Sequence, residues 1–229
     1  MSARVNPTTR KNGKTRILLI DDHAILRQGL AQLINQEPDL SVCGQAEEAP
    51  KGFELAGSLK PDVAVVDISL KGGNGLELIK NLKASYPNLP LLVLSMHDES
   101  LYAERVLRAG SLGYIMKEEA AESVLVGIRK VLKGEIVLSD KMQARLLHQL
   151  VSGGLKKGGS PIDSLSDREL EVFRMIGEGR GTRQIAEDLH LSVRTVEAYR
   201  EYIKEKLNLK NATELIQHAF QWVHSGALP

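Results

Sequence analysis

The chain has few of the residues that mark disulfide-rich or membrane proteins. One of its 229 residues is a cysteine, Cys43, and a single thiol cannot form a disulfide within the chain. Cys43 lies in a strand-like stretch, and a buried, unreactive thiol is its expected state. No apolar run approaches the ~20 residues of a membrane helix, so a membrane-spanning protein is not expected.

The chain also lacks an excess of charge of either sign. Its net charge is +1, and its 42% hydrophobic and 26% charged residues are ordinary for a soluble protein. Residues 164–229 contain nine lysines and arginines against ten acidic residues. Bulk charge therefore gives no support for a nucleic-acid partner, and such a role depends on where the charges lie.

The first 14 residues have no apolar segment of the kind that a secretory signal requires. We interpret residues 1–14 as a disordered basic tail, with a nonspecific nucleic-acid arm as the alternative. A cytoplasmic protein is the expectation.

Hydrophobic runs that end on chemically active side chains are the strongest feature present. Residues 63–66 are apolar and end on Asp67, and residues 16–20 end on Asp21 and Asp22. If both runs are parallel strands, these carboxylates meet at the carboxyl edge of one sheet, where open α/β folds hold their chemistry. Three carboxylates in one pocket repel one another and favour a bound divalent cation.

Two further runs end on complementary groups. Residues 91–94 lead into Ser95, and residues 113–116 lead into Lys117. A carboxylate with a cation, a hydroxyl and an ammonium suits phosphoryl transfer to Asp67, with Ser95 and Lys117 binding phosphoryl oxygens. Each acid alone is more often a helix cap or loop residue. The order of all of them along about 100 residues favours the chemical interpretation.

Strand-like and helix-like segments alternate about five times between residues 16 and 134, which predicts an α/β domain with a doubly wound, five-stranded parallel sheet. The expected helices span residues 23–37, 48–59, 75–85, 100–109 and 120–133. Residues 139–150 predict a further helix that docks on this domain. Residues 152–161 are rich in glycine and predict a flexible linker, so residues 139–163 are interpreted as helix plus linker.

The order of these side chains resembles the response-regulator receiver domain of two-component signalling, over roughly residues 15–138. The resemblance implies that Asp67 accepts a phosphoryl group from the phosphohistidine of a sensor histidine kinase. It implies Mg²⁺, replaceable by Mn²⁺, bound by Asp22, Asp67 and the backbone carbonyl of Ser69, with Asp21 acting through a water. It also implies that Ser95 and Tyr114 form a switch.

Two positions depart from the receiver pattern. Lys71 and Glu118 stand where many receivers have proline. Without proline a cis peptide after Lys117 costs about 3 kcal/mol. We therefore expect the loop after Lys117 to follow a different path, with the chemistry unaffected.

Residues 164–229 predict a second, all-α domain of four helices. Ser166 and Glu169 form a capping box for the first helix, which Gly177 and Gly179 end. Short and long helices follow at residues 182–189 and 193–207, the latter capped by Ser192. Asn211 and Glu214 are expected to form a capping box for the fourth helix, which ends near Val223. A tight turn between the second and third helices is typical of a helix-turn-helix module.

The local sequences resemble the LuxR-type DNA-binding domain over nearly all of residues 164–226. The matching segments are residues 165–169 (LSDRE), 184–186 (QIA), 191–196 (LSVRTV) and 206–207 (KL). A receiver followed by this domain is the architecture of the NarL/FixJ group of transcriptional regulators. The alternative is a four-helix domain that binds another protein.

Helical periodicity places a set of residues of the third helix opposite its core positions: Arg194, Ala198, Glu201 and Glu205, with Glu197 at the edge. This face is expected in the major groove of double-stranded DNA, where glutamate can accept from cytosine and alanine can contact a thymine methyl. Acids repel phosphates, so basic residues must flank the face. The candidates are Arg183, Arg194, Lys204, Lys206 and Lys210, with Thr195 donating to a phosphate. Alternatively, Glu197 and Glu201 are solvated or pair with Arg194 and Lys204.

The apolar residues of the fourth helix cover more of its surface than one core face requires. Leu215, Ala219 and Trp222 share one side, while Ile216 and Phe220 turn away from it. We expect the second side to form a homodimer contact on DNA or after phosphorylation. The alternative is that it covers the receiver in the resting state.

The whole sequence thus predicts a phosphorylation-dependent transcriptional regulator that is not otherwise an enzyme. A Mg²⁺-dependent phosphohydrolase with an aspartyl intermediate is one rival. Such enzymes usually carry an acid/base two residues after the nucleophile, where this chain has Ser69. A protein-binding adaptor is the other rival.

Overall fold

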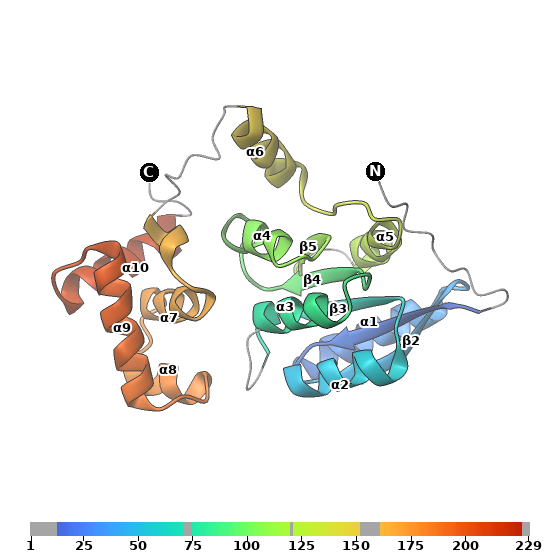
Figure 1. The fold of residues 1–229 in the computed structure, drawn as a ribbon, viewed down its shortest axis with the longest axis horizontal. Helices are drawn as coiled ribbons and strands as arrows, with labels where there is room; N and C mark the ends of the chain where they lie inside the picture. Colours follow the sequence, from blue (N-terminus) through green and yellow to red (C-terminus); the bar gives the residue numbers. More distant parts are fainter. Residues whose placement is uncertain (1–12, 71–74, 120, 152–160, 226–229) are drawn as a thin grey trace. The chain divides into compact units, whose positions relative to one another are not determined.

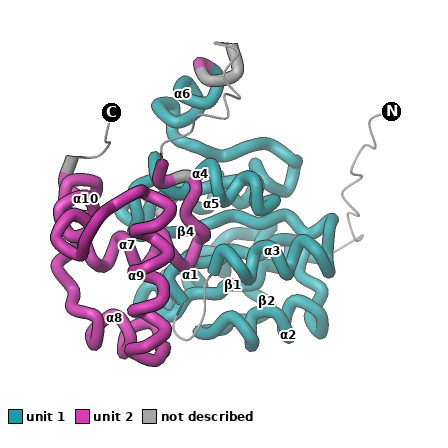
Figure 2. The backbone as a smooth tube through the Cα atoms, turned by 60° about the vertical axis from the view of Figure 1, so that its left-hand side comes forward, with its two compact units in different colours: residues 1–147 teal, residues 148–229 magenta. Residues whose placement is uncertain are grey.

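The structure is a computed structural model that describes residues 13–70, 75–119, 121–151 and 161–225. The chain divides into two compact units, residues 1–147 and 148–229, coloured separately in Figure 2. Most of the predicted tail, the residues of the predicted linker from 152 to 160, and Lys71 lie outside the described residues. Each unit is considered by itself below.

The first unit is built on a parallel sheet of five strands in the order β2-β1-β3-β4-β5. Its strands are β1 (Thr15–Ile20), β2 (Leu40–Ala46), β3 (Val63–Asp67), β4 (Leu91–Ser95) and β5 (Gly113–Met116). In this order the chain moves outward from β1 in both directions, which is the doubly wound topology predicted from the sequence. The carboxyl ends of β1, β3, β4 and β5 therefore share one edge.

Helices cover both faces of this sheet (Figure 1). They are α1 (Ala24–Gln36), α2 (Ala49–Leu59), α3 (Gly75–Ser85), α4 (Glu99–Arg108) and α5 (Ala121–Leu132). On one face α1 and α5 pack apolar side chains, such as Ile34 and Ile128, against the strands. On the other face α2 contacts α3, and α3 contacts α4. The apolar runs 17–20, 63–66 and 91–94 of β1, β3 and β4 are buried, because helices cover both faces of the sheet.

The five predicted helices are confirmed, and their ends differ from the prediction by at most one residue. His23 and Glu48 precede α1 and α2 as extended cap residues, so these helices begin one residue later than predicted. Asp98 caps α4 by accepting a hydrogen bond from the Ser100 backbone N–H at 2.7 Å. That cap lets α4 begin at Glu99, one residue earlier than predicted.

Gly75 lets the chain close tightly against the end of β3. A Cβ atom at this position would lie 2.1 Å from the backbone oxygen of Asp67 and 2.6 Å from the Cα atom of Ile68. No side chain can occupy that space, so any other residue at position 75 would displace the backbone that carries Asp67.

After α5 the chain runs along the open edge of β5 and enters α6 (Asp140–Val151) (Figure 1). Val137 forms a parallel bridge with Gly113, and Met142 is buried. The predicted helix after residue 138 is thus confirmed, and its first turn packs on the first unit. Cys43, on the edge strand β2, is half-buried rather than fully buried, and burial raises the pKa of its thiol.

The second unit contains a short 3₁₀ helix, η1 (Pro161–Ser164), and four α-helices. The α-helices are α7 (Asp167–Gly177), α8 (Thr182–Asp188), α9 (Val193–Leu207) and α10 (Ala212–Ser225). Trp222 of α10 packs on Phe173 of α7, with ring centroids 5.5 Å apart. The four-helix prediction is confirmed, including the buried positions Val196 and Ile203 of α9.

The caps of this unit follow the sequence closely. The Ser166–Glu169 capping box is present, and the Ser192 hydroxyl accepts from the Thr195 backbone N–H at 3.0 Å. The second predicted capping box is wrong in one half. The side chain of Asn211 accepts from the Glu214 N–H, but the Glu214 carboxylate reaches the N–H of Lys210 instead of that of Asn211.

Within the described residues, no helix is long and apolar enough to cross a membrane.

Candidate functional site

Lys117 and two aspartates form the centre of a pocket at the carboxyl edge of the sheet. The Lys117 Nζ atom lies 2.6 Å from Asp67 Oδ2 and 2.8 Å from Asp21 Oδ2. All three side chains are almost fully buried. Because β1, β3 and β5 end at the same edge, residues separated by up to 96 positions meet here.

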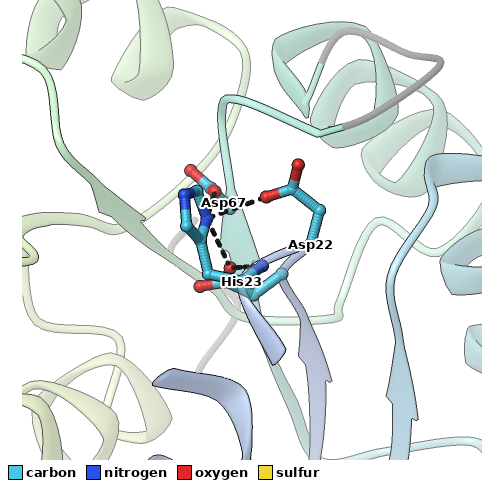
Figure 3. A group of neighbouring side chains, drawn as sticks. Asp22, His23 and Asp67 are labelled. Atoms are coloured by element: carbon cyan, nitrogen blue, oxygen red, sulfur yellow. Dashed lines mark hydrogen bonds and ion pairs between the residues drawn. The ribbon is translucent and has the colours of Figure 1, made fainter. Parts of the chain in front are cut away.

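Asp22 and His23 complete the pocket on the side of β1. The Nδ1 atom of His23 lies 2.8 Å from Asp22 Oδ1 and 3.7 Å from Asp67 Oδ2 (Figure 3). It also lies 3.3 Å from the Nζ atom of Lys117. His23 was not among the predicted site residues, although it directly follows the acidic pair in the sequence.

The electrostatics of the pocket penalise the ionised form of Asp67. Burial raises the pKa of the Asp67 carboxyl, the nearby charge of Asp21 acts in the same direction, and Lys117 offsets these effects only in part. Added positive charge at the pocket would therefore favour the ionised carboxylate that a nucleophile requires.

The acidic side chains have the composition and spacing of a divalent-cation site. One ligand atom each from Asp21, Asp22, His23 and Asp67 can be chosen so that all lie within 4.8 Å of one another. In the described residues, Asp21 Oδ2 and Asp22 Oδ1 are buried without a hydrogen-bond donor. Their 2.8 Å contacts to Lys117 and His23 are close in distance but lack hydrogen-bond geometry. Unsatisfied buried carboxylate oxygens fit a hard cation such as Mg²⁺.

Ser69 links the pocket to the loop after β4. Its backbone N–H donates to Asp67 Oδ1 at 3.0 Å, which fixes the orientation of that carboxylate. Its hydroxyl lies 2.6 Å from the Nε2 atom of His97. His97 was also missed by sequence reasoning, and its signal was its place two residues after Ser95.

Ser95 and Tyr114 meet around the backbone of His97. The Ser95 hydroxyl accepts from the His97 N–H at 3.1 Å, and the Tyr114 hydroxyl donates to the His97 carbonyl at 2.7 Å. Burial raises the pKa of the Tyr114 phenol, and a hydrogen bond with Ser95 partly opposes this. Tyr114 thus lies with its ring buried and its hydroxyl beside Ser95.

The loop after Lys117 contains no cis peptide: every peptide bond in the described residues is trans, including the one before Glu118. The Lys117 backbone N–H donates to the carbonyl of Ser95 at 2.8 Å, so β5 and β4 remain paired up to the site.

The second unit exposes the predicted face of α9. Arg194, Glu197, Glu201 and Glu205 are exposed, and Ala198 and Thr195 are half-buried. The Thr195 hydroxyl is 2.7 Å from the Ser192 hydroxyl at the start of the helix. An N-terminal hydroxyl pair beside exposed Arg194 is suited to a phosphate.

Several of the predicted basic residues are already engaged within the unit. Lys204 Nζ lies 2.8 Å from Glu201, as the alternative interpretation of this face expected. Lys206 Nζ lies 2.6 Å from the buried Glu169 at the start of α7. The Lys206 ion pair therefore joins α9 to α7 within the unit. The other basic candidates, Arg183, Arg194 and Lys210, are exposed.

Two family models match the chain. Residues 17–129 match the response regulator receiver domain, and residues 163–219 match the bacterial regulatory proteins of the LuxR family. The oxygen regulatory protein NreC of Staphylococcus aureus is 36% identical over 210 residues, which is 90% of this chain and 97% of NreC.

Solved structures of response regulators are also similar. RcsB from Salmonella enterica serovar Typhimurium, bound to the promoter P1flhDC with a phosphomimetic BeF₃⁻, is 26% identical with a TM-score of 0.61. The match covers 90% of this chain and 98% of that one. A LuxR-family response regulator from Aurantimonas sp. SI85-9A1 is 28% identical, with a TM-score of 0.56, over 61% of this chain and 99% of that one.

Proposed function

The chain belongs to the response regulators of the NarL/FixJ group, with a receiver domain and a LuxR-type helix-turn-helix domain, and we propose that Asp67 is its phosphoryl acceptor. The observation that carries this proposal is the buried contact of Asp67 with Lys117 and Asp21 at the carboxyl edge of the sheet. The proposed donor is the phosphohistidine of a sensor histidine kinase.

In the proposed reaction a carboxylate oxygen of Asp67 attacks the phosphorus of phosphohistidine. A new O–P bond forms as the P–N bond breaks, and the histidine nitrogen leaves with the bonding pair. Lys117 then pairs with a phosphoryl oxygen, and the Ser95 hydroxyl donates to another. Hydrolysis of the acyl phosphate returns Asp67 to its carboxylate, so no other enzymatic activity is required.

Asp22, Asp67 and the backbone carbonyl of Ser69 are proposed to hold Mg²⁺, with Asp21 acting through a water, and Mn²⁺ is expected to substitute. When bound, the cation supplies charge that neutralises the phosphoryl oxygens as the donor bond breaks. Ser69 is suited to this role because its N–H holds Asp67 Oδ1 in place.

Asp67→Asn should abolish phosphoryl uptake, because an amide is not a nucleophile. The measurement is the mass increase of the intact protein after incubation with acetyl phosphate and Mg²⁺. Asp98→Asn is the matched control, since Asp98 caps α4 outside the pocket and asparagine is an equally good cap. Full labelling of Asp67→Asn would contradict the assignment.

Removal of the cation should stop labelling of the parent protein. Without it, three acidic side chains face the incoming phosphoryl anion. We expect chelator-treated protein to take no label, and added Mg²⁺ or Mn²⁺ to restore labelling. Labelling at the parental rate in excess chelator would rule out the proposed cation role.

The second unit is proposed to place α9 in the major groove of double-stranded DNA. Glu197, Ala198 and Glu201 would face the bases. The flanking residues that would meet phosphates are Arg183, Arg194, Thr195 and Lys204. Phosphorylation is proposed to favour a homodimer on DNA. The proposed location of the protein is the cytoplasm. Support for DNA as the partner comes from the exposed face of α9 and from the similarity to RcsB bound to a promoter.

A further inference from the structure

A buried carboxylate joins the start of α4 to the start of α6. Glu99 is the first residue of α4 and is buried. One of its carboxylate oxygens accepts from the backbone N–H of Ser139 at 2.8 Å, and the other accepts from the Ser139 hydroxyl. The Ser139 hydroxyl in turn accepts from the N–H of Met142 at 3.2 Å and so caps α6.

The position of Glu99 at two helix N-termini favours this contact. The carboxylate lies in the first turn of α4 and at the cap of α6, so the N-terminal ends of two helices face it. Both ends favour negative charge, and hydrogen bonds to a carboxylate are stronger than those between neutral groups. We call this contact, between the Glu99 carboxylate and Ser139, the α4–α6 latch.

The segment before the latch is attached to β5. The Tyr114 N–H donates to the Val137 carbonyl at 2.8 Å, and the Val137 N–H donates to the Leu112 carbonyl at 2.9 Å. Leu138, directly before Ser139, and Met142, three residues after it, are buried. The connection out of the receiver is therefore held both by β5 and by α4.

The first attachment point, β5, is hydrogen-bonded to the proposed phosphorylation switch through Tyr114, and the second, Glu99, follows that switch closely in the sequence. The Tyr114 hydroxyl donates to the carbonyl of His97, and the His97 N–H donates to the Ser95 hydroxyl. His97 lies two residues before Glu99. If Ser95 turns its hydroxyl toward a phosphoryl group on Asp67, the hydrogen bonds of His97 must rearrange, and Glu99 is tied to that backbone.

We propose that the α4–α6 latch transmits the state of the Asp67 pocket to α6, and through it to the residues that lead into the DNA-binding domain. This inference rests on the proposed phosphorylation of Asp67. Glu99 and Ser139 are positioning residues here: they touch neither the phosphoryl group nor DNA. Opening and closing of the latch supplies the two-state element that such coupling requires.

Glu99→Gln tests the latch, because the amide keeps the size of the side chain but loses its charge and one acceptor. The first measurement is hydrogen exchange of the α6 amides from residue 142 to residue 147, with and without acetyl phosphate and Mg²⁺. In the parent protein, the rate of α6 hydrogen exchange should differ between the two conditions. In Glu99→Gln the α6 amides should exchange fast, at the same rate with and without acetyl phosphate. Labelling at Asp67, followed by the mass increase, should stay at the parental rate.

The second measurement is DNA affinity, on a fragment enriched by the parent protein from a random pool. Coupling of ordinary strength gives the parent a ratio of about 5-fold or more between phosphorylated and unphosphorylated protein. In Glu99→Gln this ratio should fall to about 1, since a broken latch transmits nothing.

Matched variants separate the latch from a general loss of stability. Ser139→Thr keeps the hydroxyl and the cap and should retain the parental ratio, whereas Ser139→Ala should lose it. Glu104→Gln removes an exposed carboxylate of the same helix, paired with Arg108, and should behave like the parent. Should Glu99→Gln fail to fold, as judged by circular dichroism, the Ser139 pair decides the question.

The latch would be overturned if either Glu99→Gln or Ser139→Ala kept both parental properties. These are the ratio of DNA affinities between phosphorylated and unphosphorylated protein, and the change of α6 hydrogen exchange on phosphorylation. A parent protein that takes no label at Asp67 would instead contradict the proposed function. The two failures are therefore distinguishable.

Discussion

Glu169 makes several contacts at the start of α7 that depend on its charge. Its carboxylate accepts from the Ser166 N–H and from Lys206 Nζ, both at 2.6 Å. Burial acts to raise the pKa of Glu169, but the hydrogen bonds from Lys206 and Ser166 outweigh it, so the pKa lies below its usual value.

A lowered pKa in the folded state means that Glu169 stabilises the second unit when it is ionised. This stabilisation is fully present above the unfolded pKa of about 4.3 and is lost as the pH falls through the lower, folded pKa. Glu169→Gln should lower the free energy of unfolding by about 1–2 kcal/mol at pH 7. The difference from the parent protein should shrink as the pH falls below about 4.

The fluorescence of Trp222 can measure this effect in the intact chain. It is the only tryptophan in the sequence, and it packs on Phe173 of α7. Urea midpoints would be compared at several pH values, with exposed Glu205→Gln as the control. A constant difference between Glu169→Gln and the parent across that range would contradict the charge-dependent role.

The pocket residues could be predicted from the sequence because each ends a hydrophobic run. A parallel sheet then brings Asp21, Asp67, Ser95 and Lys117 to one edge without further information. His23 and His97 could not be placed in this way, since they lie in loops beyond the strands. The direction of a loop side chain depends on tertiary contacts, such as the 2.6 Å approach of His97 to Ser69.

Among the elements, α10 presents an apolar side that its own unit does not cover. Leu215, Ala219 and Trp222 are buried, whereas Ile216 is 47% and Phe220 is 54% exposed. The wide apolar stripe predicted from the sequence is therefore confirmed. The identity of the surface that covers Ile216 and Phe220 remains a prediction: a second copy of the chain on DNA.

Ile216→Glu or Phe220→Glu should weaken dimer formation on DNA, because each places a charge in an apolar contact. A two-fold pair sets the recognition helices about one DNA turn apart, so binding to inverted repeats should lose cooperativity. The measurement is the mass of the complex of phosphorylated protein with DNA, which distinguishes one bound subunit from two. Gln217→Glu adds the same charge at an exposed neighbouring position and serves as the control. Undiminished cooperativity in Ile216→Glu and Phe220→Glu would place the interface elsewhere.

The recognition helix α9 offers a test of sequence reading. If Glu197 accepts from a base, Glu197→Ala should change the preferred site in a random-pool selection more than it changes overall affinity. Glu187→Ala, at an exposed position of α8 outside the groove-facing side of α9, should leave the preferred site unchanged. An unchanged site in Glu197→Ala would favour a solvated glutamate, as the Glu201–Lys204 pair already does for its neighbour.

Helix positions were predictable because caps and apolar periodicity are local. Ser166, Ser192 and Asn211 each mark a helix start that the structure reproduces. Contacts made by the polar face of a helix are not local. The sequence makes Lys206 a candidate to flank the DNA-facing side of α9, and in the structure it pairs with Glu169, which lies 37 residues earlier in the sequence. Helical periodicity predicts on which side of α9 the Lys206 side chain lies, but it does not predict which residue that side chain contacts.

For the whole molecule, the sequence separated two modules by a change in composition, and two compact units are present. Each has its own apolar core, around the sheet in one and around Phe173 and Trp222 in the other. The latch between Glu99 and Ser139 had no sequence signal, because a buried glutamate and a capping serine 40 residues apart are individually ordinary.

The net charge of +1 makes the salt dependence of DNA binding a test of local charge. Attraction governed by net charge would give almost no dependence. If basic side chains of the second unit meet phosphates, about four to six contacts per subunit give a slope of log K against log salt of roughly −4 to −5. The intact phosphorylated protein and a fragment of residues 160–229 should share this slope per bound subunit, even where their affinities differ.

Arg183→Ala should reduce the magnitude of the slope by about 1, while Lys51→Ala in the first unit should leave it unchanged. Equal slopes in the parent and Arg183→Ala would remove Arg183 from the contacts. A slope near zero in the parent would remove the phosphate contacts altogether, and with them the placement of α9 in the groove.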